Sequence, residues 1–238
     1  MPETGHDPSR PSGASALHGR RRGKKLRTYQ AGLCETLLPR LAVDPGRPVA
    51  SPGALFQPVA EDVWLEIGFG GGEHLAVQAE RHPEVGFIGC EPFVNGVAKI
   101  LAEIDSRKLG NIRLHADDAR LLIDRLPDAS IARVYLLYPD PWPKRRQRKR
   151  RFVSAVMLDN LARIMKPGAE LRFATDIDDC AGWVLARVLD SRFFCWTARD
   201  CADWLAPWAG WPGTRYEAKA FAEGRRPAYF TFERNQAE

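Results

Sequence analysis

The sequence lacks the features of membrane-spanning and metal-binding proteins. No run of about 18 apolar residues occurs in the chain, and the N-terminal segment has no apolar signal-peptide core. The five cysteines include no C-x-x-C pair and the five histidines are scattered, so we expect reduced thiols and no metal site. These absences argue against a membrane protein and predict a cytoplasmic one.

What is present describes one globular domain with unevenly placed charge. Of the 238 residues, 45% are hydrophobic and 27% charged, which excludes a disordered or fibrous chain. The net charge of +5 conceals two basic segments: residues 1–27 carry seven bases and two acids, and residues 144–151 carry seven bases and no acid. The remainder carries 28 acids against 21 bases. This distribution predicts a polyanionic partner that binds at defined places.

The N-terminal segment differs in composition from the rest of the chain. Residues 1–25 are rich in Pro, Gly, Ser and Arg and show no apolar periodicity. They predict a disordered, basic arm, followed by a single domain over residues 26–238.

Short apolar runs alternate with helix-length segments from residue 61 onward. The pattern predicts strands at 63–67, 85–90, 112–115, 131–138 and 169–174, and helices at 72–81, 93–107, 119–125, 152–165 and 177–189, with another helix at 29–41. Residues 193–198 and 228–233 are predicted to form an antiparallel edge. The fold class is therefore α/β, with a doubly wound, mostly parallel sheet of seven strands.

Acidic and polar residues follow five of these strands. Ligands bind at the carboxyl ends of strands in such sheets. The residues at that edge are Glu66, Gly68, Glu91, Asp117, Asp118, Asp140, Thr175 and Asp176. So many carboxylates at one edge favour a cationic ligand.

The segment VWLEIGFGGGEH predicts a strand, a glycine loop and a helix start. Gly68 and Gly70 allow a tight turn and a close approach to a ligand. A dinucleotide fingerprint would need glycine where Glu73 stands, and this carboxylate would repel a pyrophosphate. S-adenosylmethionine has no phosphate and carries two cationic groups, so it fits better. Glu91 would accept its ribose hydroxyls and Asp118 its adenine amino group.

The stretch YPDPWPKRRQRKRRF, residues 138–152, follows the fourth strand. Its three prolines predict a rigid turn that presents Asp140 beside seven bases. If the methyl acceptor is a purine base, this carboxylate distinguishes guanine from adenine. It would accept hydrogen bonds from guanine N1–H and its amino group, and would stabilise the positive charge that methylation of guanine N7 creates. Adenine amine methylation commonly uses a neutral Asn-Pro-Pro-aromatic turn instead. The aspartate therefore favours guanine.

These motifs, with IGCEPF, DDA at 117–119, FATD at 173–176 and GTRYEAKA at 213–220, resemble the TrmB-type tRNA (guanine-N7-)-methyltransferases over roughly residues 28–234. That family methylates N7 of guanosine 46 in the variable loop of tRNA. The resemblance implies a Rossmann-like class I fold and S-adenosylmethionine as cofactor. It implies cofactor contacts at Glu66, Glu91, Asp118 and Asp140, with Asp140 catalytic. It also implies guanosine or tRNA contacts at Lys144, Asp176, Thr214, Arg215, Tyr216 and Glu217.

The basic run is expected to hold the backbone of tRNA beside the reaction turn. The candidate contacts are Arg146, Arg148, Lys149, Arg150 and Arg151. Trp142 either stacks on the target base or has a structural role. Residues 214–217 form a plain loop by pattern alone. We hypothesise that the N-terminal arm tethers tRNA, and a monomer and a homodimer are both compatible with the sequence.

Two alternatives remain at this point. One is a noncatalytic RNA-binding protein that keeps the methyltransferase fold, and the intact strand-end acids argue against it. The other is a methyltransferase of a small molecule or protein, which would give no reason for seven bases beside the pocket.

Overall fold

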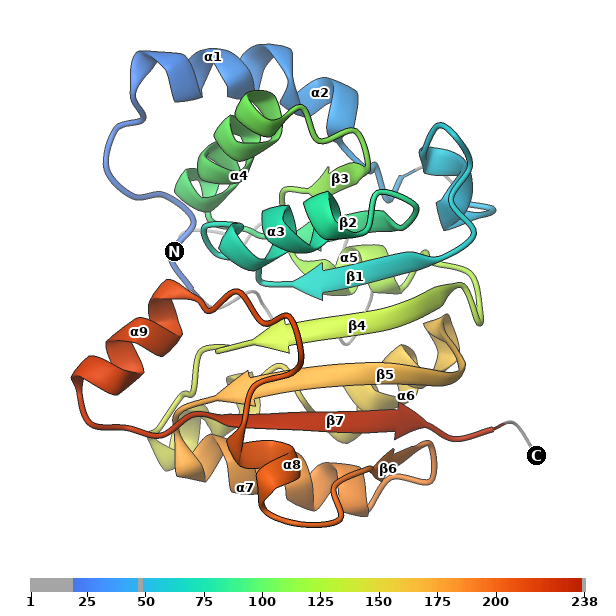
Figure 1. Ribbon diagram of the computed structural model, residues 1–238, viewed down its shortest axis with the longest axis vertical. Coiled ribbons are helices and arrows are strands. Elements are labelled where there is room, and N and C mark those ends of the chain that lie inside the picture. The colour runs from blue at the N-terminus through green and yellow to red at the C-terminus, as the bar shows by residue number, and fades with distance from the viewer. Residues whose placement is uncertain (1–18, 47–48, 237–238) are drawn as a thin grey trace, which may run out of the picture.

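A seven-stranded sheet forms the centre of the computed structural model, which describes residues 19–46 and 49–236 (Figure 1). The strands are β1 (Val63–Ile67), β2 (Gly86–Cys90), β3 (Ile112–His115), β4 (Ile131–Leu137), β5 (Met165–Thr175), β6 (Phe194–Trp196) and β7 (Ala228–Arg234). Their order is β3-β2-β1-β4-β5-β7-β6. β7 runs antiparallel to β5 and β6, and the other pairs are parallel. The predicted fold class is confirmed.

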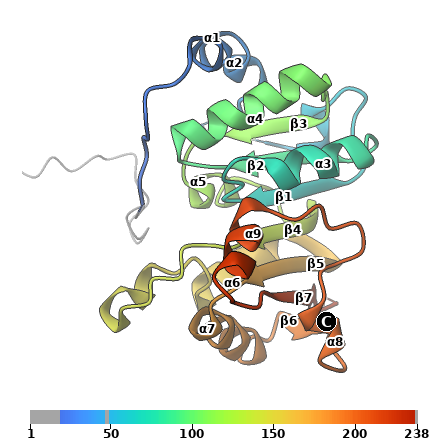
Figure 2. The same ribbon diagram turned by 60° about the vertical axis from the view of Figure 1, so that its left-hand side comes forward.

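Helices cover both faces of the sheet (Figures 1 and 2). α3 (Glu73–Arg81) and α4 (Val94–Arg107) lie on one face, and α5 (Ala119–Ile123), α6 (Ala155–Ile164) and α7 (Asp178–Leu189) lie on the other. α1 (Thr28–Thr36) packs against α4, and α2 (Leu38–Leu41) contacts β3. α8 (Ala202–Leu205) and α9 (Arg215–Ala222) precede β7, while the 3-10 helices η1 (Pro52–Leu55) and η2 (Arg145–Arg150) lie in connections. No helix of the described part of the chain is long and apolar enough to cross a bilayer.

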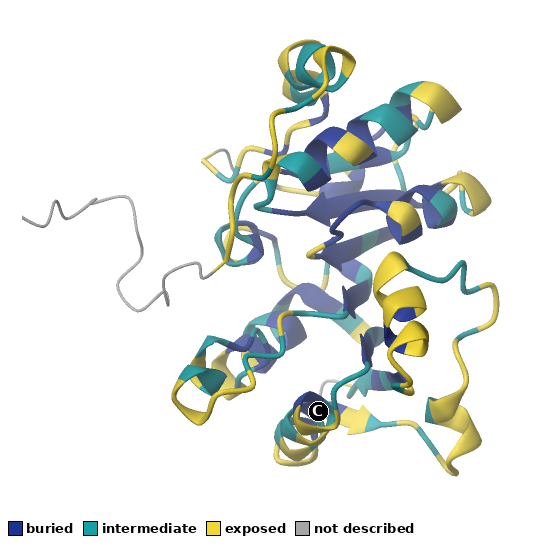
Figure 3. Ribbon diagram, turned by 90° about the vertical axis from the view of Figure 1, so that its left-hand side faces the viewer, coloured by how far each residue is buried: buried dark blue, intermediate teal, exposed yellow. Residues whose placement is uncertain are grey.

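The core consists of apolar layers on the two faces of the sheet (Figure 3). β2 is buried along its whole length, as expected for a strand covered on both sides. Leu122, Leu161 and Val184 form part of the layer beneath α5–α7, and Leu75 and Ile100 part of the layer beneath α3 and α4. The two layers fix the strand ends at one edge, where the predicted site residues lie.

Three of the differences between the element boundaries and the sequence-based predictions have a clear local cause or partner. The helix predicted at 29–41 is divided into α1 and α2, with Pro39 in the first turn of α2, where a missing N–H is tolerated. The helix predicted from residue 152 begins at Ala155, because the Ser154 hydroxyl caps it by accepting the Met157 N–H at 3.2 Å. β5 begins at Met165, which pairs with Ile131.

Part of the predicted N-terminal arm contacts the domain. Residues 1–18 lie outside the described residues, but residues 19–25 run beside the start of α4. The Val94 N–H donates to the Arg21 carbonyl at 2.9 Å, and the Gly23 N–H donates to Asn95 Oδ1 at 2.6 Å. Asn95 Nδ2 in turn donates to the Lys24 carbonyl at 2.7 Å. These contacts hold the last residues of the arm in a defined place.

Candidate functional site

A cavity of about 400 Å³ lies at the carboxyl ends of β1, β2 and β4. The strand order reverses between β1 and β4, which is where ligands bind in open α/β sheets. Five of the six predicted cofactor residues line this cavity: Gly68, Gly70, Glu91, Asp118 and Asp140. Glu66 is not among the lining residues.

The glycine loop after β1 is tied to the end of β2 through Glu91. Gly68 and Gly70 have φ angles of +73° and +59°, a region that side chains with a Cβ rarely adopt. The Gly70 N–H donates to Glu91 Oε2 at 2.7 Å, and the Phe93 N–H donates to Oε1 at 2.9 Å. One buried carboxylate therefore organises the backbone around the cavity.

Burial also changes the acidity of Glu91. Removal from water raises the pKa of its carboxyl above the usual range, while the N–H groups of Phe93 and Gly70 and the nearby Arg215 oppose the rise. Each oxygen accepts one backbone hydrogen bond and retains acceptor capacity for a ligand hydroxyl. Glu91 therefore suits the predicted ribose contact.

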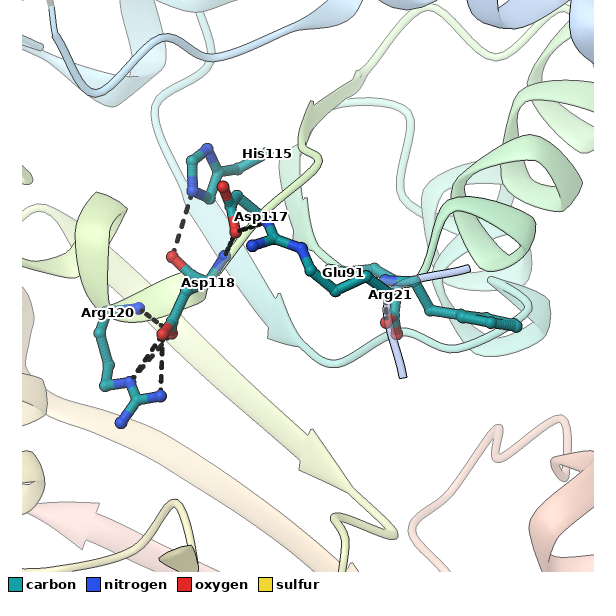
Figure 4. Close-up of polar contacts among 7 residues, drawn as sticks. Arg21, Glu91, His115, Asp117, Asp118 and Arg120 are labelled. Atoms are coloured by element: carbon teal, nitrogen blue, oxygen red, sulfur yellow. Dashed lines mark hydrogen bonds and ion pairs between the residues drawn. The ribbon is translucent and has the colours of Figure 1, made fainter. Parts of the chain in front are cut away.

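Arg120 occupies part of the hydrogen-bonding capacity of the Asp118 carboxylate (Figure 4). It caps α5, and its Oδ1 accepts the Arg120 N–H at 3.1 Å. The Arg120 guanidinium also contacts it, with Nε 3.0 Å from both carboxylate oxygens and Nη2 2.8 Å from Oδ2. A carboxylate has about four acceptor positions, so an adenine amino group would share this side chain with Arg120.

Glu66 lies behind the glycine loop. Its side chain is 4% exposed, and Oε2 is 2.7 Å from Nδ1 of the equally buried His74 at the start of α3. Glu66 thus contacts the start of α3 directly behind the glycine loop, and its predicted cofactor contact stays a prediction.

The Asp140 turn has an unusual backbone on either side of the aspartate. Tyr138 and Trp142 have φ angles of +50° and +42°, although each precedes a proline and neither is glycine. Such conformations cost of order 1–3 kcal/mol each and persist only where surrounding contacts enforce them. Here the Tyr138 N–H donates to the Ala174 carbonyl at 2.8 Å, and Arg151 Nε donates to the Pro141 carbonyl at 2.7 Å. The turn is therefore held firmly from both ends.

Asp140 faces the cavity from this turn. Partial loss of hydration raises the pKa of its carboxyl. Among the described residues, no side-chain hydrogen bond or ion pair is recorded for it.

The basic run divides into three groups with different surroundings. Arg150 lines the cavity and lies over the Trp142 ring, 4.9 Å from its centroid. Arg148 and Arg151 pair with Asp179 at the start of α7. Four exposed residues have no ion pair with a described residue: Lys144, Arg145, Arg146 and Lys149.

Arg151 requires a correction. The prediction that it contacts RNA does not agree with its position, because it is 6% exposed and its guanidinium holds Pro141 and Asp179. It joins the Asp140 turn to α7, and its hydrogen bonds go to Pro141 and Asp179.

The segment 214–217 is the start of α9 and not a plain loop. The Thr214 hydroxyl accepts the Glu217 N–H at 3.1 Å, and Thr-x-x-Glu is the capping-box pattern that could have predicted this helix. Arg215 and Tyr216 line the cavity above the glycine loop. A Cβ at Gly70 would lie 3.2 Å from both side chains, so α9 covers the loop closely.

The other predicted substrate residues lie outside the cavity lining. Glu217 is buried and accepts hydrogen bonds from Trp211 Nε1, at 2.9 Å, and from the Tyr229 hydroxyl. Asp176 pairs with Arg225 Nε at 2.7 Å. Lys144 is exposed on the surface before η2. The structure thus places Arg215 and Tyr216 in the same cavity lining as Asp140 and leaves Lys144, Asp176, Thr214 and Glu217 outside that lining.

The donor set suits S-adenosylmethionine. Acids, glycine backbone and apolar walls, including Ile67, Leu136 and Phe152, line the cavity together. The described residues hold no group of three or more His, Cys, Asp or Glu arranged for a metal ion. The sequence did not predict that Gly19 and Arg20, from the N-terminal arm, also line this cavity.

Solved structures with a similar fold are methyltransferases. The 16S rRNA methyltransferase KamB superposes with a TM-score of 0.54 at 18% identity, covering 74% of this chain and 89% of its own. A single-residue mutant of the 16S rRNA (adenine(1408)-N(1))-methyltransferase from Catenulisporales acidiphilia gives 0.52 at 16% identity, covering 82% and 93%. At these identities the likeness shows the fold alone.

Sequence comparisons identify the family. A family model described as "Putative methyltransferase" matches residues 60–229. A tRNA (guanine-N(7)-)-methyltransferase from Rhodopseudomonas palustris (strain BisB18) is 55% identical, covering 93% of this chain and 89% of its own length. One from Brucella melitensis biotype 1 is 53% identical, covering 92% and 94%. The chain therefore belongs to the tRNA (guanine-N(7)-)-methyltransferase family.

Proposed function

We propose that this protein transfers the methyl group of S-adenosylmethionine to N7 of guanosine in tRNA, and that the guanosine is position 46 in the variable loop. The observation that carries the proposal is the cavity in which the glycine loop, Glu91 and Asp118 meet the Asp140 turn. Family membership supports the tRNA substrate. Because tRNA is a cytoplasmic substrate, the proposal places the reaction in the cytoplasm.

The cofactor side of the cavity would bind S-adenosylmethionine without a metal. Glu91 would accept the ribose hydroxyls, and the backbone of Gly68 and Gly70 would lie close to the rest of the molecule. Asp118 would accept the adenine amino group beside Arg120. When bound, S-adenosylmethionine supplies an electrophilic methyl group on a sulfonium.

Asp140 would select the base and stabilise the charge that develops on it. Guanine N7 has an in-plane lone pair, so no general base is needed to make it nucleophilic. Asp140 would accept hydrogen bonds from guanine N1–H and its amino group, and its carboxylate would stabilise the purine as it becomes positive. The strained turn and Arg151 keep this carboxylate in place, so that alignment contributes to the rate.

Cations around the opening would bind the RNA backbone. Arg150, Arg215 and the exposed Lys144 provide positive charge on the substrate side, and Tyr216 offers a ring for stacking. Trp142 lies under Arg150 and also lines the cavity, which is compatible with both a structural role and stacking on the target base.

The product identifies the reaction. The protein is incubated with methyl-labelled S-adenosylmethionine and bulk tRNA that lacks modifications, and the RNA is then digested to nucleosides. The proposal predicts label in 7-methylguanosine. Label in another nucleoside would change the assigned base, and no transfer with intact tRNA binding would indicate a noncatalytic RNA-binding protein.

A further inference from the structure

A second cavity, of about 510 Å³, lies between η2, the start of α6 and α7. We call it the α7 cavity. Its lining includes Arg148 and Lys149 from η2, Arg151, Ser154 at the cap of α6, and Arg187 and Asp190 from the end of α7. It shares no lining residue with the cavity that contains Asp140.

Positive charge exceeds negative charge in the α7 cavity. Four of its lining residues are Arg or Lys, against one carboxylate, Asp190. Asp179 pairs with both Arg148 and Arg151 and so offsets part of this positive charge. Lys149 has no ion pair with a described residue, and the guanidinium of Arg187 donates to the Trp183 carbonyl at 3.0 Å but joins no acid among those residues.

These cations are held where an anion would stabilise them. The pKa of Arg187 is lowered, first because the guanidinium is partly buried and second because Arg151 lies near it. Nε of Arg148 is buried without a hydrogen-bond partner among the described residues. The N-terminal end of α6 adds a partial positive charge from the helix dipole. Geometry and charge both fit an anion with several acceptor oxygens.

The position of the α7 cavity relates it to the reaction site. We call the cavity lined by Asp140 the reaction cavity. η2 separates it from the α7 cavity, because Arg150 lines the reaction cavity while Arg148 and Lys149 line the α7 cavity. An RNA strand that leaves the reaction cavity across η2 meets these cations next. Phosphate oxygens are the anionic groups of such a strand.

We infer that the α7 cavity binds a backbone phosphate of the substrate RNA next to the segment that carries the target base, through Lys149 and Arg187. The inference rests on the proposed function for the identity of the RNA. Arg187 lies 36 positions beyond the end of the basic run in sequence, and the fold joins it to that run.

The test compares Arg187→Gln with Arg40→Gln, which removes the same charge from an exposed position of α2, at the opposite end of the molecule from α7 (Figure 1). The dissociation constant for unmodified tRNA is measured over a series of salt concentrations. Arg187→Gln is expected to raise it by roughly fivefold to tenfold and to reduce the slope of log affinity against log salt by about one. Affinity for S-adenosylmethionine and the rate at saturating tRNA should stay within about twofold of those of Arg40→Gln.

Further variants separate charge from folding. Arg187→Lys keeps the charge without the guanidinium that covers Trp183, and should retain most of the tRNA affinity. Lys149→Gln removes an exposed side chain that has no ion pair with a described residue, and should weaken tRNA binding in the same way with an unchanged melting temperature. tRNA affinities for Arg187→Gln and Lys149→Gln equal to that of Arg40→Gln would overturn the inference.

Two other outcomes are distinguishable. If calorimetry shows that Arg187→Gln loses inorganic phosphate binding while tRNA affinity is unchanged, the cavity is a site for a free anion and the inference is wrong. If the unaltered protein methylates no guanosine in tRNA, the proposed function fails, whatever the tRNA affinities of the variants are.

Discussion

Two regions of this protein present their charges in different ways. We call the side of the cavity formed by Glu91 and Asp118 the cofactor wall, and the basic run at residues 144–151 the basic face. On the cofactor wall, Glu91 and Asp118 follow consecutive parallel strands and meet in one cavity. On the basic face, seven bases within eight residues point into different surroundings: Arg150 lines the reaction cavity, Arg151 is buried, and Lys149 lies in the α7 cavity. The location of each acid follows from its place directly after a strand, whereas the location of each base depends on the residues packed around it.

The two regions are expected to bind different ligands and to respond to different solution conditions. The acids of the cofactor wall would bind a small cation and should respond to pH. The cations of the basic face would bind a polyanion and should respond to salt. Asp140 lies between the two and belongs to the chemical step.

Asp140→Asn should have the largest effect. It keeps the size of the side chain but removes the charge that would stabilise methylated guanine, so the single-turnover rate should fall by roughly 10²–10³-fold. Binding of S-adenosylmethionine and of tRNA, measured by calorimetry and filter binding, should change only a few-fold. Asp159→Asn on the exposed face of α6 is the matched control. A rate within threefold of that control would remove Asp140 from the mechanism.

Glu91→Gln should weaken S-adenosylmethionine binding by roughly 10- to 100-fold, because charge-assisted hydrogen bonds are lost within a buried site. The raised pKa of Glu91 gives a second, pH-dependent test. In the unaltered protein the carboxylate becomes protonated as pH falls through this raised pKa, so affinity should decrease at a higher pH than for an ordinary carboxyl group. That decrease should be absent from Glu91→Gln. If it persists in the variant, another group controls cofactor binding.

Arg151→Gln separates the buried base from the exposed ones. Loss of the guanidinium leaves the Pro141 carbonyl without its donor, so the free energy of unfolding should fall by about 2 kcal/mol. Chemical denaturation measures this change, and the methylation rate should fall with it because the Asp140 turn is less firmly held. Arg146→Gln, on the exposed side of the same run, should leave unfolding unchanged. Equal stabilities would refute the structural role of Arg151.

Truncation of the N-terminal arm should have the smallest effect. The hypothesis that the N-terminal arm tethers tRNA makes a specific prediction for removal of residues 1–18. The Michaelis constant for tRNA should rise a few-fold, and its dependence on salt concentration should weaken. Removal of residues 1–25 should also weaken S-adenosylmethionine binding, by about twofold to threefold. The reason is that Arg20 lines the reaction cavity. The exposed ion pair between Arg21 and Asp117 should contribute only modestly to holding the arm at this cavity (Figure 4). Unchanged kinetics in both truncations would reject the tether.

The sequence predicted the cofactor wall because strand ends are set by local pattern and by topology. Apolar runs located β1, β2 and β3, and the parallel arrangement then required Glu91 and Asp118 to lie at one edge. The surroundings of Glu66 differ from those of Glu91 and Asp118. Glu66 precedes the glycine loop in sequence, but its side chain points to His74 and not into the cavity.

The basic face was less predictable because burial of a base depends on residues far away in sequence. Arg151 is enclosed by Asp179 and Trp183, from a helix whose packing no local pattern specifies. Arg187 joins the basic surface for the same reason. α9 was predictable in part, since Thr214 and Glu217 form a capping box, but its position over Gly70 depends on the path of the chain between β6 and β7.

The most direct test of the account uses two transcripts of one tRNA that differ only in having guanosine or adenosine at position 46. Each is incubated with the protein and labelled S-adenosylmethionine, and the nucleosides are analysed by mass spectrometry. The account predicts about one methyl group per guanosine transcript, recovered as 7-methylguanosine, and none in the adenosine transcript. Equal labelling of both transcripts, or a methylated base other than 7-methylguanosine, would contradict it.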